Sequence, residues 1–189
     1  MNRTLLAMPL HFREDRTTQA AARLLRLKGG RMPYLSLIKL LYLADRKALL
    51  ELGRPISYDL FVSMPHGPVL SRTLDLITGE PDPDGDSYRR EYISEPEGYD
   101  VRLVRDAPNS QLSQADEKIL DEVFSRYGHL TKWQLRDLSH TLPEWRDPDG
   151  SSVPIPLYEI LIQQGVTPEN AKAICLDLGA ESLAEYQLT

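Results

Sequence analysis

Residues 32–53, MPYLSLIKLLYLADRKALLELG, form the longest apolar-rich segment of the chain and constrain its fold more than any other stretch. Apolar residues at helical spacing occupy two faces of this segment: Leu37, Leu40, Leu41, Ala44 and Ala48 on one, and Tyr34, Ile38, Tyr42 and Leu49 on the other. Pro33 suits a first helical turn, and Gly53 suits a C-terminal cap. A helix that is apolar on two faces packs against neighbours on both sides, so we predict that it is the central helix of the fold.

The composition is that of an ordinary globular protein, and it limits the classes of partner. With 189 residues, 41% of them hydrophobic, the chain can bury a core without disulfides or metals. We divide it into an N-terminal extension, residues 1–16, and one domain, residues 17–189. The net charge of −6 argues against non-specific binding to nucleic acid or anionic membranes, because both need a face rich in Lys and Arg; it permits a basic partner.

The cysteine content and the hydropathy of the chain indicate the cellular compartment in which we expect the protein. Cys175 is the only cysteine, which excludes an intrachain disulfide and a cysteine-based zinc cage. On an apolar helix face, it is interpreted as a small buried hydrophobe rather than a reactive thiol. No apolar run approaches the ~20 residues of a membrane span, and the apolar N-terminal stretch is too short and too broken for a signal peptide. We therefore expect a cytoplasmic, bacterial-type protein.

The other segments predict an α+β fold that is mainly α-helical, with a small antiparallel sheet or hairpin. Helices are expected over residues 17–28, 69–79, 112–128 and 131–140 and from residue 167 onward. Residues 54–63 have the composition of a strand, and residues 88–94 and 99–106 are predicted to pair as a hairpin. Ser113 with Asp116, and Thr131 with Gln134, have the spacing of capping boxes.

The stretch SMPHGPVL, residues 63–70, places a proline on each side of His-Gly. Pro65 and Pro68 restrict the residues before them to extended conformations, and Gly67 can adopt a positive φ. Pro68 also suits the first turn of a helix. We predict a rigid junction between a strand and a helix, with His66 at its tip as a candidate contact for a partner.

Standard catalytic signatures are missing: there is no Gly-rich phosphate loop, HExxH, CxxC or GxSxG motif. Asp82, Asp84 and Asp86 alternate as at the start of a calcium loop. However, Ser87 stands where that loop needs glycine, and Ile93 stands where it needs a bidentate glutamate. A solvated turn is the favoured interpretation.

Two histidines have partners that could suggest catalysis. His66 with Ser71 could be a base and a nucleophile, but neither the spacing nor a nucleophile-elbow sequence supports this pairing. His140, Glu144 and Trp145 could form a site, although a histidine that bonds a backbone turn beside a core-anchored tryptophan is more common. We therefore predict a protein that is not an enzyme and that carries no cofactor and no metal.

The order of these segments resembles a known family. Residues 39–77, KLLYLADRKALLELGRPISYDLFVSMPHGPVLSRTLDLI, resemble the core signature of the Panacea-domain, or SocA-like, antitoxin family. Residues 112–145, LSQADEKILDEVFSRYGHLTKWQLRDLSHTLPEW, are similar to the second half of that family, and the resemblance covers about residues 18–150. The positions that carry it are Lys39, Leu40, Leu41, Tyr42, Gly53, Pro55, Asp59, Gly67, Pro68, Val69, His140 and Trp145.

The resemblance implies a type II toxin–antitoxin role, in which the protein binds and neutralises a toxin protein encoded beside it. Neutralisation could cover the toxin's active site or deliver the toxin to a cellular protease, and the sequence leaves both routes open. A toxin-binding domain would expose an apolar patch in isolation. The candidate partner-binding anchors are Arg46, Tyr58, His66 and Trp145.

The alternative is a DNA-associated transcriptional regulator or a phage-encoded factor, since the family includes phage-associated proteins. Helices combined with a hairpin can imitate a winged helix. However, a recognition helix needs clustered basic residues, and the helices here carry mixed charge. Arg102 and Arg105, with the nearby YRREY, form the only basic concentration, and acids surround it. Nucleic acid is therefore not the expected partner, and the oligomeric state is left open.

Overall fold

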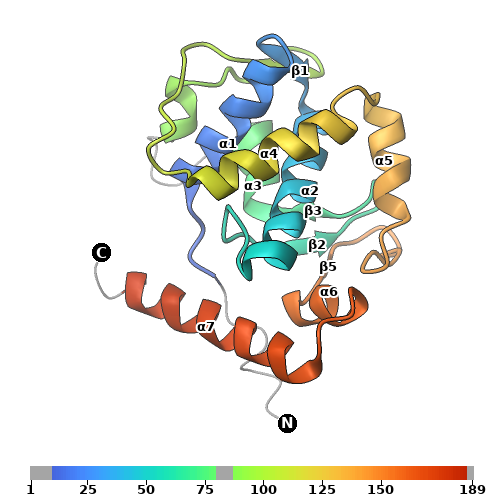
Figure 1. Ribbon diagram of the computed structural model, residues 1–189. Coiled ribbons are helices and arrows are strands. Elements are labelled where there is room, and N and C mark those ends of the chain that lie inside the picture. The colour runs from blue at the N-terminus through green and yellow to red at the C-terminus, as the bar shows by residue number, and fades with distance from the viewer. Residues whose placement is uncertain (1–9, 80–86, 187–189) are drawn as a thin grey trace.

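The computed structural model describes residues 10–79 and 87–186, and within these ranges the fold is α+β and mainly helical, as the sequence predicts (Figure 1). Its α-helices are α1 (Glu14–Leu27), α2 (Tyr34–Leu52), α3 (Ser71–Thr78), α4 (Gln114–Tyr127), α5 (Lys132–His140), α6 (Leu157–Gln163) and α7 (Pro168–Tyr186). Its strands are β1 (Arg31–Pro33), β2 (Phe61–Ser63), β3 (Val69–Leu70), β4 (Asp100–Arg102) and β5 (Val153–Pro154).

The helix α2 is the centre of the fold. It contacts α1, α3, α4, α5 and α6, so helices cover it on several sides (Figure 1). Leu37, Tyr42 and Leu49 are fully buried, and Gly53 ends the helix in the left-handed conformation with φ 72°. One detail differs from the prediction: Pro33 is the last residue of β1 and the N-cap of α2, so its ring lies just outside the first turn.

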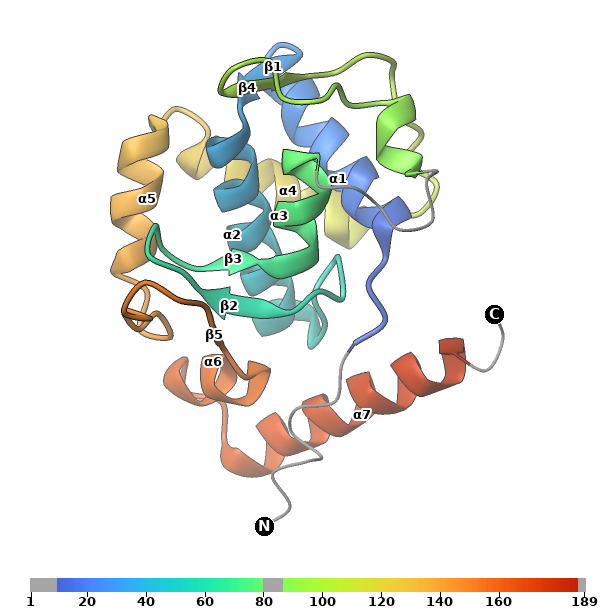
Figure 2. The ribbon, with the colours of Figure 1, turned by 180° about the vertical axis from the view of Figure 1, so that it is seen from behind.

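The small sheets join segments that are distant in sequence. The β1 strand pairs antiparallel with β4, and the second sheet has the order β3-β2-β5 (Figure 2). The predicted hairpin of residues 88–94 and 99–106 is confirmed in part: the N–H of Ser94 donates to the carbonyl of Arg102 (3.0 Å), and the N–H of Val104 donates to the carbonyl of Tyr92 (2.7 Å). Residues 88–91 form a 3-10 helix, and a bridge between Ile93 and Leu103 links the two segments. The strand β4 also pairs with β1, which brings Met32 opposite Val101, and both side chains are buried in the core.

Local helix signals were accurate where capping residues support them. The predicted capping boxes are present at α4 and at α5. The strand expected over residues 54–63 is limited to β2, and the helix expected to begin at residue 69 begins at Ser71. The short helix α6 was not predicted; it contacts α7, which lies along one side of the molecule (Figure 1).

The described ranges contain no helix that combines the length and the apolar character needed to cross a bilayer. In the same part of the chain, no group of three or more His, Cys, Asp or Glu side chains is arranged to hold a metal ion.

Candidate functional site

The turn between β2 and β3 forms one wall of the candidate site. The backbone N–H of Gly67 donates to the carbonyl of Met64 (2.9 Å), which closes a β-turn with Pro65 at its second position. This position favours proline, because the turn requires the φ that the pyrrolidine ring imposes. The predicted junction between a strand and a helix is therefore a turn between two strands, since β3 pairs with β2 before α3 begins.

Gly67 is required both by its conformation and by its neighbours. Its φ is +87°, which glycine adopts without strain. A Cβ at this position would lie 2.2 Å from Ser139 Oγ, 3.0 Å from Lys39 Nζ and 3.1 Å from His140 Cδ2. The turn therefore lies directly against the first half of α2 and the end of α5, and it brings a lysine and a histidine together beneath it.

Lys39 is the main polar group under the turn. Its side chain is fully buried, and Nζ donates a hydrogen bond of 2.8 Å to the carbonyl of Pro68. Burial lowers the pKa of Lys39 to about 7, because a buried ammonium loses its hydration. The ammonium form has three donors, and Pro68 supplies one acceptor. Within the described ranges, no carboxylate forms an ion pair with this lysine.

His140 and Trp145 pack beside Lys39. Their ring centroids are 4.3 Å apart, and the Trp145 indole N–H donates to the carbonyl of Met64 (3.1 Å). Burial, and then the charge of Lys39, lower the pKa of His140. A hydrogen bond between the His140 ring and the backbone of Pro65 opposes this shift. Trp145 thus anchors the turn, and the imidazole of His140 packs between the turn and the indole.

A hollow of about 390 Å³ opens beside this cluster, between the turn, the first half of α2 and the beginning of α5. We call it the α5 groove. Its apolar wall consists of Leu35, Ile38, Met64, Val69 and Leu74, and its aromatic wall of Tyr34, Tyr99 and Trp133. Its titratable nitrogen groups belong to Lys39, His66 and Lys132, and no carboxylate of the described residues lines it.

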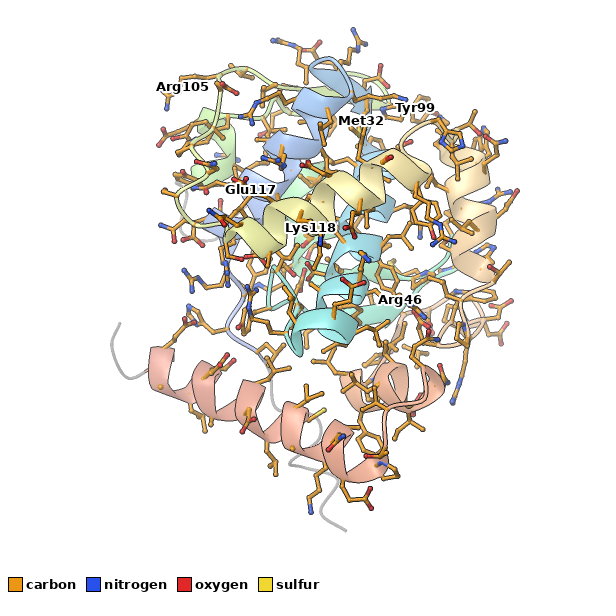
Figure 3. The ribbon with its side chains drawn as sticks, viewed as in Figure 1. Met32, Arg46, Tyr99, Arg105, Glu117 and Lys118 are labelled. Carbon is orange, nitrogen blue, oxygen red and sulfur yellow. The ribbon has the colours of Figure 1, made fainter. Side chains whose placement is uncertain are left out.

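The rim of the α5 groove exposes two large aromatic side chains. Tyr99 is 69% exposed and Trp133 is 52% exposed. The ammonium of Lys132 lies 4.3 Å from the ring centroid of Tyr99 and 5.0 Å from that of Trp133. Arg136 covers Trp133 at 5.0 Å, and Figure 3 shows Tyr99 beside the beginning of α5. Exposed aromatic and cationic groups of this kind are typical of the energetic centres of protein interfaces.

Sequence reasoning missed Tyr99, Lys132 and Trp133, although the sequence holds a signal for the tryptophan. In TKWQLRDL, Trp133 falls outside the stripe of Leu135 and Leu138 that faces the core. A large aromatic residue on the solvent side of a short amphipathic helix is an indication of an interface.

The four anchors named from the sequence lie in different surroundings. His66 is exposed at the turn and lines the α5 groove. Arg46 Nε contacts Glu144 at 2.6 Å, and Tyr58, which is 7% exposed, donates its hydroxyl to Glu181 (3.0 Å). Arg46, Tyr58 and Trp145 are thus used within the fold, and a role for them in binding stays a prediction.

Several positions of the family pattern hold the chain around α2. Tyr42 donates its hydroxyl to the buried Glu144 (3.0 Å), the carboxylate that Arg46 also contacts. Asp59 accepts from the backbone N–H groups of Arg72 (3.1 Å) and Thr73 (2.7 Å), and so caps the first turn of α3. Burial raises the pKa of Asp59, although these hydrogen bonds oppose the shift. Asp59 therefore fixes the connection between α2 and α3 that carries the turn, and Glu144 ties the segment after α5 to α2.

Other candidates from the sequence lie away from this site. Cys175 is buried on α7, and burial raises the pKa of its thiol, which favours the inert form. Asp82, Asp84 and Asp86, the calcium-loop candidates, lie outside the described residues.

Comparisons with known proteins agree with the pattern in the sequence. Residues 37–146 match the family model described as antitoxin SocA-like, Panacea domain. This region runs from the buried face of α2 through the turn and the α5 groove to the Trp145 anchor. No curated protein and no solved structure matches the chain.

Proposed function

The chain belongs to the antitoxin SocA-like, Panacea-domain family, and on that basis we propose that it neutralises a partner toxin by binding it directly. The observation that best supports direct binding is the α5 groove. Apart from Tyr34 and Leu35, its lining residues lie within the matched region, and it presents exposed Tyr99 and Trp133 next to cations. A surface of this kind in a folded domain is suited to another polypeptide.

We propose stoichiometric binding rather than catalysis. The polar groups nearest to a catalytic arrangement are Lys39, Ser139 and His140, and packing holds them under the turn. Ser139 donates its hydroxyl to the carbonyl of Arg136 (2.7 Å), so its proton is not directed to a base. A nucleophile needs a base within hydrogen-bond reach, and the arrangement around Ser139 does not provide that bond.

The test is co-expression with the product of the adjacent open reading frame. If the proposal holds, that product arrests growth alone, growth returns when this protein is present, and the two proteins co-purify in a fixed ratio. If the neighbouring product is toxic but this protein neither restores growth nor co-purifies with it, the proposal is wrong.

Delivery to a protease is a separate step that would follow binding. It predicts that the half-life of the toxin shortens when this protein is co-expressed and recovers in a host that lacks the relevant protease. An unchanged half-life together with full growth rescue would mean that binding alone neutralises the toxin. Loss of activity at a promoter, with no toxin bound, would instead support the DNA-associated alternative.

A further inference from the structure

The cations of the α5 groove differ from most others in the molecule. The chain has 28 acidic residues and 22 Lys or Arg, so acids are in excess. Most described arginines form ion pairs, as do Lys47 and Lys118. Lys39 and Lys132 both line the groove, and neither has a carboxylate partner in residues 10–79 or 87–186. Carboxylates are in excess in this protein, yet two lysines of one groove lack them among the described residues. The groove is therefore complementary in charge to a carboxylate of a binding partner.

The contacts of Lys39 and Lys132 stabilise a positive charge less than an ion pair with a carboxylate would. Lys39 donates to one backbone carbonyl, and Lys132 lies over the rings of Tyr99 and Trp133. A carboxylate approaching Lys132 could add an ion pair without breaking an existing one. The aromatic rings beside it would exclude water, which strengthens the attraction between opposite charges.

The rest of the groove is apolar. Leu35, Met64 and Leu74 lie on its wall, and a volume of about 390 Å³ is at the small end of ligand sites, which span roughly 300–1,000 Å³. A hollow of this size suits one or two side chains of a peptide segment, not a whole helix. Its occupant must therefore combine an apolar group with a nearby negative charge.

We propose that the α5 groove binds a toxin segment in which a large apolar side chain adjoins an Asp or Glu. The apolar side chain enters against Leu35, Met64 and Leu74, and the carboxylate contacts Lys132 at the rim beside Trp133. This inference rests on the proposed antitoxin function, and it names the surface and the chemistry of the partner that this function requires.

The first experiment measures the Kd between the full-length protein and the product of the adjacent open reading frame. Lys132→Glu reverses the charge at the rim, and Trp133→Ala removes the aromatic wall. The matched control is Lys118→Glu, which makes the same charge change on α4, where the side chain is 77% exposed (Figure 3). We expect each groove variant to weaken binding at least about 10-fold and the control to bind as the wild type does.

A charge swap then tests the chemistry of the partner. Each Asp and Glu of the toxin is changed to Lys and paired with Lys132→Glu. The proposal predicts that one such change restores binding and growth rescue to this variant while weakening binding to the wild type. If no swap restores binding, the carboxylate contact is wrong.

The outcomes separate this inference from the proposed function. If the wild type binds and rescues growth and both groove variants do so equally well, the groove is not the binding site, although the antitoxin function stands. If the wild type neither binds nor rescues, both proposals fail. If Trp133→Ala changes the oligomeric state of the free protein, the occupant of the groove is a second copy, and the inference is overturned. If Lys132→Glu abolishes promoter binding instead of toxin binding, the occupant is DNA, and the inference is overturned as well.

Discussion

Two regions of the molecule, the contact between α1 and α4 and the α5 groove, both contain cationic side chains (Figure 1). Within the part of the chain that the structure describes, the cations are paired with carboxylates in the first region and unpaired in the second. At the first, Arg16 of α1 and Arg54, which follows α2, both reach the buried carboxylate of Asp116, at 3.2 and 3.0 Å, and Arg23 contacts Asp121 at 2.7 Å. In the groove, Lys39 and Lys132 have no carboxylate partner in the described ranges.

This difference distinguishes a surface that stabilises the fold from one that is available to a partner. Asp116 also accepts from the backbone N–H of Ser113 (3.0 Å) in the capping box of α4. Burial alone would raise the pKa of Asp116, but the hydrogen bonds from Arg54 and Ser113 outweigh burial and lower it. A substitution at Asp116 should therefore act on folding, and one at the groove rim should act on binding.

The largest effect on stability is expected for Asp116→Asn, which removes the charge shared by two arginines. We expect the free energy of unfolding to fall by roughly 3 kcal/mol, because breaking a buried ion pair leaves its partners uncompensated. Chemical denaturation at neutral pH measures the change. Asp121→Asn is the control, since the side chain of Asp121 is 46% exposed, and its loss should cost less than about 1 kcal/mol. Equal losses would contradict the distinction between the two carboxylates.

The second effect is expected for Gly67→Ala, which tests the close contact under the turn. The new Cβ would lie 2.2 Å from Ser139 Oγ at a positive φ, so we expect a loss of roughly 2–3 kcal/mol. Gly98→Ala is the matched control, because Gly98 also has a positive φ (+66°) but has no atom within 4 Å of the Cβ position. If the two variants lose the same stability, the packing against α5 contributes nothing.

The third effect is a pH dependence that Lys39→Met should remove. The pKa of Lys39 is about 7 in the folded protein, against an ordinary value of 10.5. Between these values the unfolded chain holds a proton that the folded protein has released, so the free energy of unfolding rises with pH. From pH 7 to pH 9 we expect the wild type to gain roughly 2 kcal/mol relative to Lys39→Met.

Denaturant titrations of both proteins at several pH values check this slope. Lys172→Met, at an exposed position of α7, should keep the slope of the wild type. Parallel curves for the wild type and Lys39→Met would show that the lysine does not titrate in this range.

The smallest effect on stability is expected for Trp133→Ala, which should change the free energy of unfolding by about 0.5 kcal/mol or less, because half of the side chain is already in solvent. Trp145→Ala is the comparison, since the indole of Trp145 is hydrogen-bonded to the turn and packed on His140. Its removal should destabilise the protein more, by roughly 2–3 kcal/mol. Thermal melts rank the two variants, and the reverse order would show that Trp133 belongs to the core.

The elements predicted well from the sequence are those whose signals are local. The helix α2 has its apolar faces and Gly53, and α4 and α5 have capping boxes whose members are three residues apart. The sequence predicted the local pairing of residues 92–94 with residues 102–104 but not the pairing of β4 with β1, because Met32 is far from Val101 in the chain. Likewise, Val69 was compatible with either a helix or a strand until β2 lay beside it.

The candidate site shows the same division. The sequence indicated His66 and the turn, since proline and glycine restrict the backbone locally. It did not indicate which cations would find carboxylates, because Arg16 and Asp116 are far apart in the chain and meet only through the packing of α1 on α4.

By itself, therefore, the sequence determined the central helix, the capped helices, the rigid turn and the family, all of which depend on neighbouring residues and their order. The tertiary structure alone decided that Lys39 is buried and that Lys132 lies without a carboxylate partner among the described residues. Burial and charge pairing depend on every segment that packs nearby, and no local pattern contains that information.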